Sequence, residues 1–409
     1  MKNLYLLFKD FWKSFPASVK TITLINLLFI ARKTFLNTAR EVGDYSATGG
    51  GSGLALLCIL LACLVLFSKI SIIKRYIGKV SPFTNYYLFA LLSFLWAGNF
   101  VIIMFKGSEV IASFFLVCTA IYLLPSVKQS LLYVIMLATA ATVFDLFHYY
   151  ISYGFAFWHT NGYTYTSMMA LLLMMGAMKV GLFSFKALKW LVYFHAFAFI
   201  TGTSSASYIA FIIGLIVYFS ASRKKINVGK TVLICLFAYG LYAVAEDTIN
   251  SYVFYGKTQE RIENGSGRES IYNACFEAWK ASPIFGHGFL VGERSLSKYG
   301  LGLQVISAHN TFLSVLVNTG IIGLILYLLF WLRLGVRLIK MMGKTVYVVV
   351  CIPAIVAAFV NANAFPAIGS DWNYVAPTIY GLLAMVMFKI GTRAEITETN
   401  SLLRKNRFE

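Results

Sequence analysis

The sequence predicts an all-α polytopic membrane protein with about 12 transmembrane helices and one long outer loop that contains short helices. Of its 409 residues, 59% are hydrophobic and only 12% are charged, and the mean hydropathy is +0.74. The apolar residues fall in blocks of about 17–25, the length that crosses a bilayer as a helix. This low charge and this block length exclude an ordinary soluble protein of the same size.

Twelve blocks qualify as spans, with edges defined to within several residues. Arg32 and Lys33 interrupt the first block, and the stretches 109–150 and 186–221 can each be divided in another way. The predicted spans are residues 18–36, 52–72, 82–105, 109–127, 128–150, 164–182, 186–202, 204–221, 229–246, 309–333, 345–364 and 373–391.

Basic residues favour an even number of spans with both termini in the cytoplasm. In that orientation most of the 35 lysines and arginines lie in cytoplasmic segments, as the positive-inside rule requires. The chain then divides into residues 1–246 with the first nine spans, a loop at 247–308, residues 309–391 with the last three spans, and a cytoplasmic tail at 392–409. No short cleavable signal precedes soluble sequence, so we expect the start of the chain to be retained.

The same distribution accounts for the net charge of +19 without nucleic acid, because the basic residues are scattered as anchors along the cytoplasmic face. Among the six cysteines, only Cys275 is expected in an outer segment, so no disulfide is predicted. The sequence contains no Cys-x-x-Cys motif and no cluster of histidine and cysteine, and we expect neither a metal nor a cofactor.

The loop at 247–308 has its own organisation. A flexible break at Gly265–Gly267 precedes Ser270, which is a candidate N-cap. Pro283 then ends a short interfacial helix, and the following "GHGF" is a turn. The apolar residues at helical spacing in this helix are Ile271, Ala274, Cys275 and Ala278. A loop of this length is usually functional.

Arginines in this loop are candidate phosphate ligands, because a guanidinium binds phosphate through two hydrogen bonds and the low dielectric near lipid strengthens them. Arg268, between the glycine break and the helix, is the first candidate, and Arg261 and Arg294 are further ones. The alternative is that these arginines only pair with neighbouring glutamates such as Glu269 or Glu293.

His309, where the chain re-enters lipid, is the candidate general base. We expect Ser307 to cap a helix that begins near Ala308, with His309 in its first turn, where the helix dipole disfavours imidazolium. A neutral imidazole at a partly dehydrated membrane edge suits a general base near pH 7. Asn310 can orient a ligand or the chain. The alternative for His309 is a polar residue tolerated at the headgroup level.

Three other histidines are weaker candidates. His287 is a turn residue that is also a candidate for contact with substrate, and His195 is expected to be a hydrogen-bonded packing residue inside a span. His148, three residues after Asp145 on the same helix, marks a candidate polar pathway in the bundle.

Three stretches resemble segments of the O-antigen ligase/polymerase superfamily. "GRESIYNACFEAWKASPIFGHGF" (267–289) has the arginine, the short helix with an aromatic residue and the Pro-x-x-Gly-x-Gly motif of its signature region. "AHNTFLSVLVNTGIIGLILYLLF" (308–330) has the His-Asn pair that opens a helix carrying Gly-x-x-Gly. "LFALLSFLWAGN" (88–99) resembles an earlier family segment.

The resemblance implies a metal-independent, inverting glycosyltransferase of the GT-C type at the periplasmic face of the bacterial inner membrane. Its donor would be a glycan on undecaprenyl pyrophosphate. His309 matches the motif histidine, which would deprotonate an acceptor hydroxyl, and Arg268 matches the loop arginine, which would hold the donor pyrophosphate. The implied partners are the lipid-linked glycan, the lipid bilayer and a chain-length regulator.

One turn departs from the family pattern. Members commonly have an arginine in a Thr-Gly-Ser-Arg turn, which here reads "TGTSSAS" (201–207), with serine at the arginine position. Either Arg32, Arg40 or Arg261 serves the phosphate instead, or the donor is held differently. The apolar sequence after Asn310 resembles the polymerase branch, so we expect an O-antigen polymerase. The alternative is an O-antigen ligase, which transfers the polymer to lipid A-core.

A transporter of lipid-linked oligosaccharides is a third hypothesis, since twelve spans also suit that function. Transporters typically show internal repeats and broken helices in matching positions of their halves. The sequence shows no such repeat, and its long outer loop occurs once. A scaffold protein would leave Arg268 and His309 unexplained.

Overall fold

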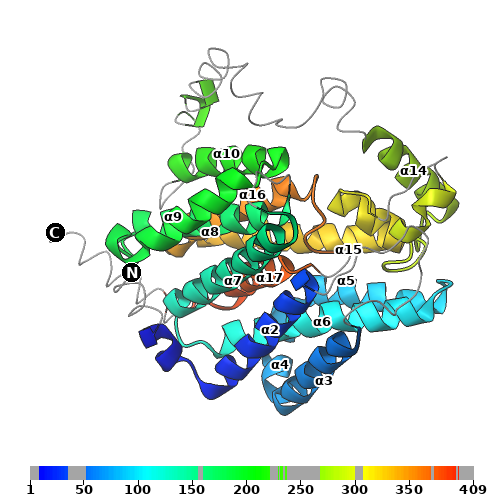
Figure 1. The fold of residues 1–409 in the computed structure, drawn as a ribbon, viewed down its shortest axis with the longest axis horizontal. Coiled ribbons are helices and arrows are strands. Elements are labelled where there is room, and N and C mark those ends of the chain that lie inside the picture. The colour runs from blue at the N-terminus through cyan, green and yellow to red at the C-terminus, as the bar shows by residue number, and fades with distance from the viewer. Residues whose placement is uncertain are drawn as a thin grey trace.

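The computed structural model describes residues 9–35, 52–154, 160–221, 229, 231–233, 235–236, 268–299, 307–369, 373–392 and 395. Within these ranges the regular elements are all helices, as the sequence predicted (Figure 1). Three of the predicted features lie mostly outside the described residues, namely the span at 229–246, the first part of the outer loop and the tail at 392–409.

The helices of the first half of the chain run from the N-terminal segment to the end of the fifth predicted span. They are α2 (Ala17–Phe35), α3 (Ser52–Ser68), α4 (Ile70–Tyr76), the 3-10 helix η1 (Ile77–Lys79), α5 (Ser81–Leu92), the 3-10 helix η2 (Ser93–Leu95), α6 (Phe100–Leu123) and α7 (Val127–Tyr153).

The helices of the second half include the two that build the outer loop. They are α8 (Gly162–Lys179), α9 (Phe185–Thr201), α10 (Ser205–Ser220), α14 (Arg268–Ala281), the 3-10 helix η4 (Glu293–Lys298), α15 (Thr311–Met341), α16 (Tyr347–Asn361) and α17 (Ala376–Phe388).

Two helices form the centre of the bundle. All residues of α17 are buried, and it packs against α6 and α7. Most of α8 is also buried, between α7, α9, α10 and α16. Burial of all or most of their residues shows that both helices are enclosed by other helices.

Three helices among the described residues are long and apolar enough to cross a membrane, namely Phe100–Leu123, Val127–Tyr153 and Thr311–Met341. The pair Gly53–Ser68 and Ile70–Lys79, bent by 78°, is a fourth candidate. Ser205–Ser220, Tyr347–Asn361 and Ala376–Phe388 are shorter apolar helices. The chain is thus an all-α membrane protein with several candidate spans, and twelve spans stay a prediction.

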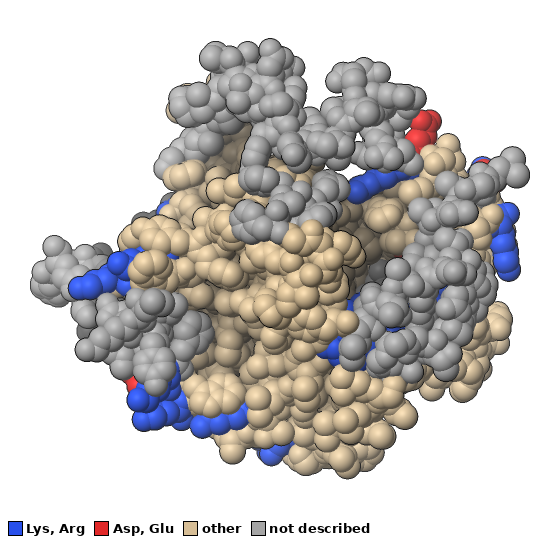
Figure 2. Space-filling model, in the orientation of Figure 1, with Lys and Arg blue, Asp and Glu red and all other residues tan. Residues whose placement is uncertain are grey.

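The distribution of charged and apolar side chains on the surface is consistent with a membrane protein. On the face drawn in Figure 2, lysine and arginine form separate small patches, and most of the described surface is uncharged. Exposed leucine, isoleucine and phenylalanine side chains are numerous, for example Leu64 at 69% and Phe67 at 79% exposure on α3. An apolar surface of this kind suits contact with lipid.

One pair of predicted spans has the wrong boundary. The polar residues at 106–108 separate the predicted spans 82–105 and 109–127, yet in the structure the break comes earlier, at 96–99, and α6 runs through them. Asn99 caps α6 by accepting a hydrogen bond from the Ile102 backbone N–H at 3.1 Å. Lys106 stays inside because its ammonium pairs with the buried Glu109 carboxylate at 3.2 Å, and Arg32 pairs with the same carboxylate.

Candidate functional site

The short helix α14 presents the buried face that its sequence predicted. Its four apolar residues pack with Ala308 and Val317 and with the partly buried Leu313 of α15. The prediction that Ser270 is the N-cap was wrong, because the helix already begins at Arg268. It ends at Ala281, before Pro283, as expected. The buried residues are Ile271, Ala274, Cys275 and Ala278.

The start of α15 differs from the prediction. Asn310 and not Ser307 is the N-cap, since its side-chain oxygen accepts hydrogen bonds from the backbone N–H of Phe312 at 2.9 Å and of Leu313 at 3.1 Å. His309 therefore precedes the helix and does not lie in its first turn. Asparagine and serine cap helices about equally well, so residue type alone did not decide between them.

His309 has a strained backbone. Its φ is +50°, a left-handed conformation that is uncommon outside glycine. Ser307 stabilises the turn, because its hydroxyl oxygen accepts a hydrogen bond from the His309 N–H at 3.2 Å. Strained residues of this kind concentrate at functional sites.

Glu293 anchors the chain that carries His309. Its side chain is 5% exposed, and its carboxylate accepts hydrogen bonds from the Ala308 N–H at 2.8 Å and from the Ser314 hydroxyl. The amide of Asn318 donates to the same carboxylate at 3.3 Å and accepts from the Glu293 N–H at 3.1 Å. These contacts tie η4 to both sides of His309. The sequence alone suggested Glu293 only as a possible ion-pair partner for a loop arginine.

Arg268 and His309 lie at neighbouring helix starts. Ile271 in the first turn of α14 and Ala308 just before α15 belong to one apolar cluster. Burial lowers the pKa of the half-buried His309, and the positive charge of Arg268 lowers this pKa further. The positive ends of the two helix dipoles also favour a neutral imidazole. The site therefore combines a neutral base with positive charge that suits an anion.

Backbone hydrogen bonds hold the loop after α14 against α15. The helix α15 is broken at Gly320, whose φ is +63°, and the freed backbone groups bond to the loop. Ile321 N–H donates to Pro283 C=O at 2.9 Å, and His287 N–H donates to Val317 C=O at 3.0 Å. Gly286 has no room for a side chain, because a Cβ there would lie 2.6 Å from the Gly320 nitrogen.

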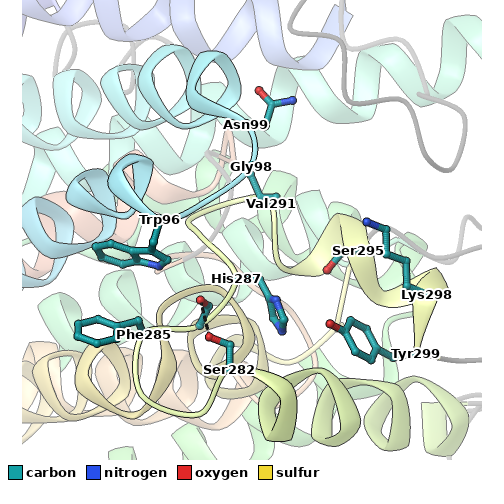
Figure 3. Close-up of a pocket in the computed structure, with 11 residues that line it drawn as sticks. Trp96, Gly98, Asn99, Ser282, Phe285, His287, Val291, Ser295, Lys298 and Tyr299 are labelled. Atoms are coloured by element: carbon teal, nitrogen blue, oxygen red, sulfur yellow. Dashed lines mark hydrogen bonds between the residues drawn. The ribbon is translucent and has the colours of Figure 1, made fainter.

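A pocket of about 710 Å³ lies between this loop and the 96–99 break. Trp96 and Phe285 border one side of it and Tyr299 the other, with His287 between them (Figure 3). The pocket joins two of the stretches that resemble the family. The hydroxyl of Ser93 accepts a hydrogen bond from the Phe289 N–H at 2.8 Å and so connects them.

A family model described as O-antigen ligase matches residues 190–328. Over these residues, about a third of its length, the chain is similar to the O-antigen ligase/polymerase superfamily. Members of this family transfer glycosyl groups, so the match indicates an enzyme. The matched region begins in α9, covers the outer loop and ends within α15. None of the curated proteins matches the chain.

The predicted site residues fall into separate groups. Arg268 and His309 lie together, Asn310 caps α15, and His287 lines the pocket. Arg294 lies half-buried in η4 and does not line that pocket. Two predicted residues, Arg261 and Arg40, lie outside the described residues.

The turn that lacks the family arginine has a structural role in this chain. Ser204 caps α10 by accepting a hydrogen bond from the Ser207 N–H at 3.3 Å, and the Ser207 hydroxyl accepts one from Asn361 at 3.1 Å. Arg32, one of the proposed substitutes, forms a buried ion pair with Glu109. The serines therefore serve helix packing at the place where the family commonly has an arginine.

His195 and His148 are the other histidines among the described residues. His195 is a buried packing residue, as predicted, and its ring nitrogens contact the hydroxyls of Thr139 at 3.0 Å and Ser167 at 3.3 Å. His148 packs edge-on against Phe35. Among the described residues, no group of three or more His, Cys, Asp or Glu could hold a metal ion.

Proposed function

We propose that the protein is an O-antigen polymerase of the bacterial inner membrane. It transfers a growing glycan from undecaprenyl pyrophosphate to a hydroxyl of a lipid-linked repeat unit at the periplasmic face. The observation that carries the proposal is the Arg268–His309 pair, in which positive charge adjoins an imidazole of lowered pKa. The family match over the same loop supports a glycosyl transfer there.

In the proposed reaction, His309 takes the proton of the acceptor hydroxyl. The acceptor oxygen then bonds to the anomeric carbon of the donor from the face opposite the pyrophosphate, and the bond from that carbon to the pyrophosphate oxygen breaks. Undecaprenyl pyrophosphate leaves with the electron pair of that bond. Attack from the opposite face inverts the anomeric configuration.

The leaving pyrophosphate needs charge compensation more than it needs an acid. Arg268 can supply it through a bidentate contact, and the positive end of the α14 dipole, where Arg268 lies, can add to it. Donors that are fixed before the reaction stabilise developing charge without reorganisation. A guanidinium in this position replaces the metal ion that many phosphate-handling enzymes use, so the mechanism is proposed to be metal-independent.

An O-antigen ligase is the second candidate, and the description of the matching family model favours it. We prefer the polymerase because the segment after Asn310, which is Thr311 and then the apolar Phe312 and Leu313, resembles the polymerase branch. The two candidates share donor, base and leaving group. They differ in the acceptor, which is a second lipid-linked repeat unit for a polymerase and lipid A-core for a ligase.

A gene deletion separates the two candidates. Without a polymerase, lipopolysaccharide cores should carry a single repeat unit, whereas without a ligase they should be bare while lipid-linked polymer accumulates. Gel electrophoresis of lipopolysaccharide distinguishes these patterns. Complementation with His309→Ala should fail to restore polymer, and Lys280→Ala, which changes an exposed cation of α14, should restore it. Full restoration by His309→Ala would disprove the assignment of the base.

A further inference from the structure

The pocket between Trp96 and Tyr299 is distinct from the Arg268–His309 pair. The imidazole Nε2 of His287 donates a hydrogen bond to the Ala278 carbonyl at 2.6 Å, which places His287 near the far end of α14. Arg268 and Ala278 are ten residues apart on this helix, or about 15 Å at a rise of about 1.5 Å per residue. The His287 side of the pocket therefore lies at a distance from Arg268, whereas Tyr299 on its other side packs against the apolar cluster that contains Ile271 and Ala308.

Aromatic rings form part of the pocket wall. The indole of Trp96 and the ring of Phe285 contact each other with centroids 5.3 Å apart, and both are partly exposed, at 38% and 48%. Tyr299 faces them across the pocket, with its ring 5.5 Å from that of His287 (Figure 3). Partly exposed aromatic faces attract the slightly positive C–H groups of a ligand.

Several polar groups of the wall are arranged as hydrogen-bond acceptors. The Ser282 hydroxyl donates to the Gly286 carbonyl at 2.9 Å, and the Ser295 hydroxyl donates to the Gly292 carbonyl at 2.7 Å. Each of these hydroxyl oxygens keeps lone pairs as acceptors. His287, which donates through Nε2, keeps the lone pair of Nδ1 in its neutral form. The ammonium of Lys298 is a donor at the exposed rim.

Aromatic faces beside fixed acceptors suit a saccharide, whose hydroxyls donate hydrogen bonds and whose ring C–H faces are apolar. The volume of about 710 Å³ lies within the range of small-molecule sites, roughly 300–1,000 Å³. Among the described residues, the lining has no carboxylate to bind a cation, and Lys298 is its only lysine or arginine, which is little for a diphosphate. A lipid tail could not donate hydrogen bonds to the lone pairs that these hydroxyls and His287 keep.

We propose that this pocket is a saccharide subsite that binds a sugar of the glycan remote from the reacting carbon. The inference rests on the proposed function and extends it, because it assigns the pocket to recognition of the repeat unit. Binding energy gained on remote parts of a substrate can be used to position the reacting groups. The subsite would thus select substrates of more than one sugar.

Binding of oligosaccharides to the purified full-length protein in detergent tests the proposal. The probes are fragments of the source bacterium's surface polysaccharide, released by mild acid and separated by length, and binding is followed by saturation-transfer NMR and calorimetry. Phe285→Ala should weaken binding about tenfold, since it removes a stacking face. Phe276→Ala is the matched control, because Phe276 is a similarly exposed phenylalanine of α14 that does not line the pocket.

Trp96→Leu is the second variant, so the test does not depend on the folding of one protein. Weaker binding in both variants with unchanged thermal unfolding supports the subsite. Absence of binding by the unaltered protein, or equal affinity in Phe285→Ala and Phe276→Ala, overturns it, as does competition for the pocket by phospholipid alone. Arg268→Ala separates the two proposals, because it should abolish polymerisation while the oligosaccharide affinity is unchanged.

Discussion

The guanidinium of Arg268 and the imidazole of His309 lie close enough for the charge of the arginine to lower the pKa of the histidine. Each residue occupies the start of a helix, and the two helices pack together over α14's buried face. A base must be neutral to accept a proton, and a pyrophosphate needs a cation beside it. The same guanidinium therefore serves both requirements in the proposed reaction.

The pH dependence of glycosyl transfer should reveal the effect of Arg268 on the pKa of His309. Activity requires neutral His309, so it should fall as the pH drops through the pKa of that histidine, which is below the usual 6.5. In Arg268→Gln the lost charge should raise this pKa, and the acidic limb of the residual activity should move to higher pH. Burial, the larger cause of the low pKa, remains in the variant.

The pH–rate profile of each variant, measured with lipid-linked donor and acceptor, checks this shift. Lys280→Gln is the control, because Lys280 is an exposed cation of the same helix that pairs with Glu277 at 2.7 Å. Its profile should coincide with that of the unaltered protein. An acidic limb that stays in place in Arg268→Gln would show that the two side chains are not coupled.

Arg268→Lys should lower transfer by roughly tenfold or more. Lysine keeps the charge and loses the planar fork, and one charge-assisted hydrogen bond contributes roughly 1.5–3 kcal/mol. The turnover rate with purified components is the measurement, and Lys280→Arg, which changes an exposed cation, should leave it unchanged. Full activity of Arg268→Lys would instead indicate that Arg268 only pairs with a neighbouring acidic group.

Local patterns in the sequence predicted the elements of the site well. The spacing of Ile271, Ala274, Cys275 and Ala278 identified the buried face of α14, because helical periodicity is visible in a single segment. Pro283 marked the end of that helix for an equally local reason. The positions of α7 to α10 also agree with the predicted spans, apart from their edges.

Features that depend on tertiary contacts were missed. The helix α15 breaks at Gly320, where the loop at 283–288 forms hydrogen bonds with the α15 backbone. The sequence around Gly320 contains no local pattern that predicts this contact. Glu293 looks like a solvated loop acid until Ala308 and Asn318 are seen to donate to it. The pocket joins residues near 96 and near 285, so only the folded chain can reveal it.

Glu293→Gln should impair the site without touching substrate. The carboxylate accepts hydrogen bonds on both oxygens, and an amide group in its place leaves a buried donor unsatisfied, at about 1–3 kcal/mol. We expect a lower unfolding temperature and a lower turnover rate. Glu277→Gln changes an acid that is 56% exposed and should alter neither. Identical unfolding of both variants would contradict the anchoring role of Glu293.

Gly286→Ala should disrupt the loop that positions the pocket and supports α15. The φ of Gly286 is +66°, which costs a non-glycine residue roughly 1–2 kcal/mol, and the added Cβ would lie 2.6 Å from backbone atoms of Asn318, Thr319 and Gly320. Since these are backbone atoms, no side chain can move away to relieve the overlap, and we expect a larger loss of stability than the φ strain alone.

The matched control is Gly335→Ala in α15, the helix that the loop contacts. Nothing lies within 4 Å of a Cβ added at Gly335. Alanine is a better helix former than glycine, so this variant should unfold at the same or a slightly higher temperature. Thermal unfolding in detergent compares the two substitutions directly. If Gly286→Ala unfolded like Gly335→Ala, the loop would not be locked to α15 by close backbone contact, and the pocket wall that depends on Phe285 and His287 would have to be placed differently.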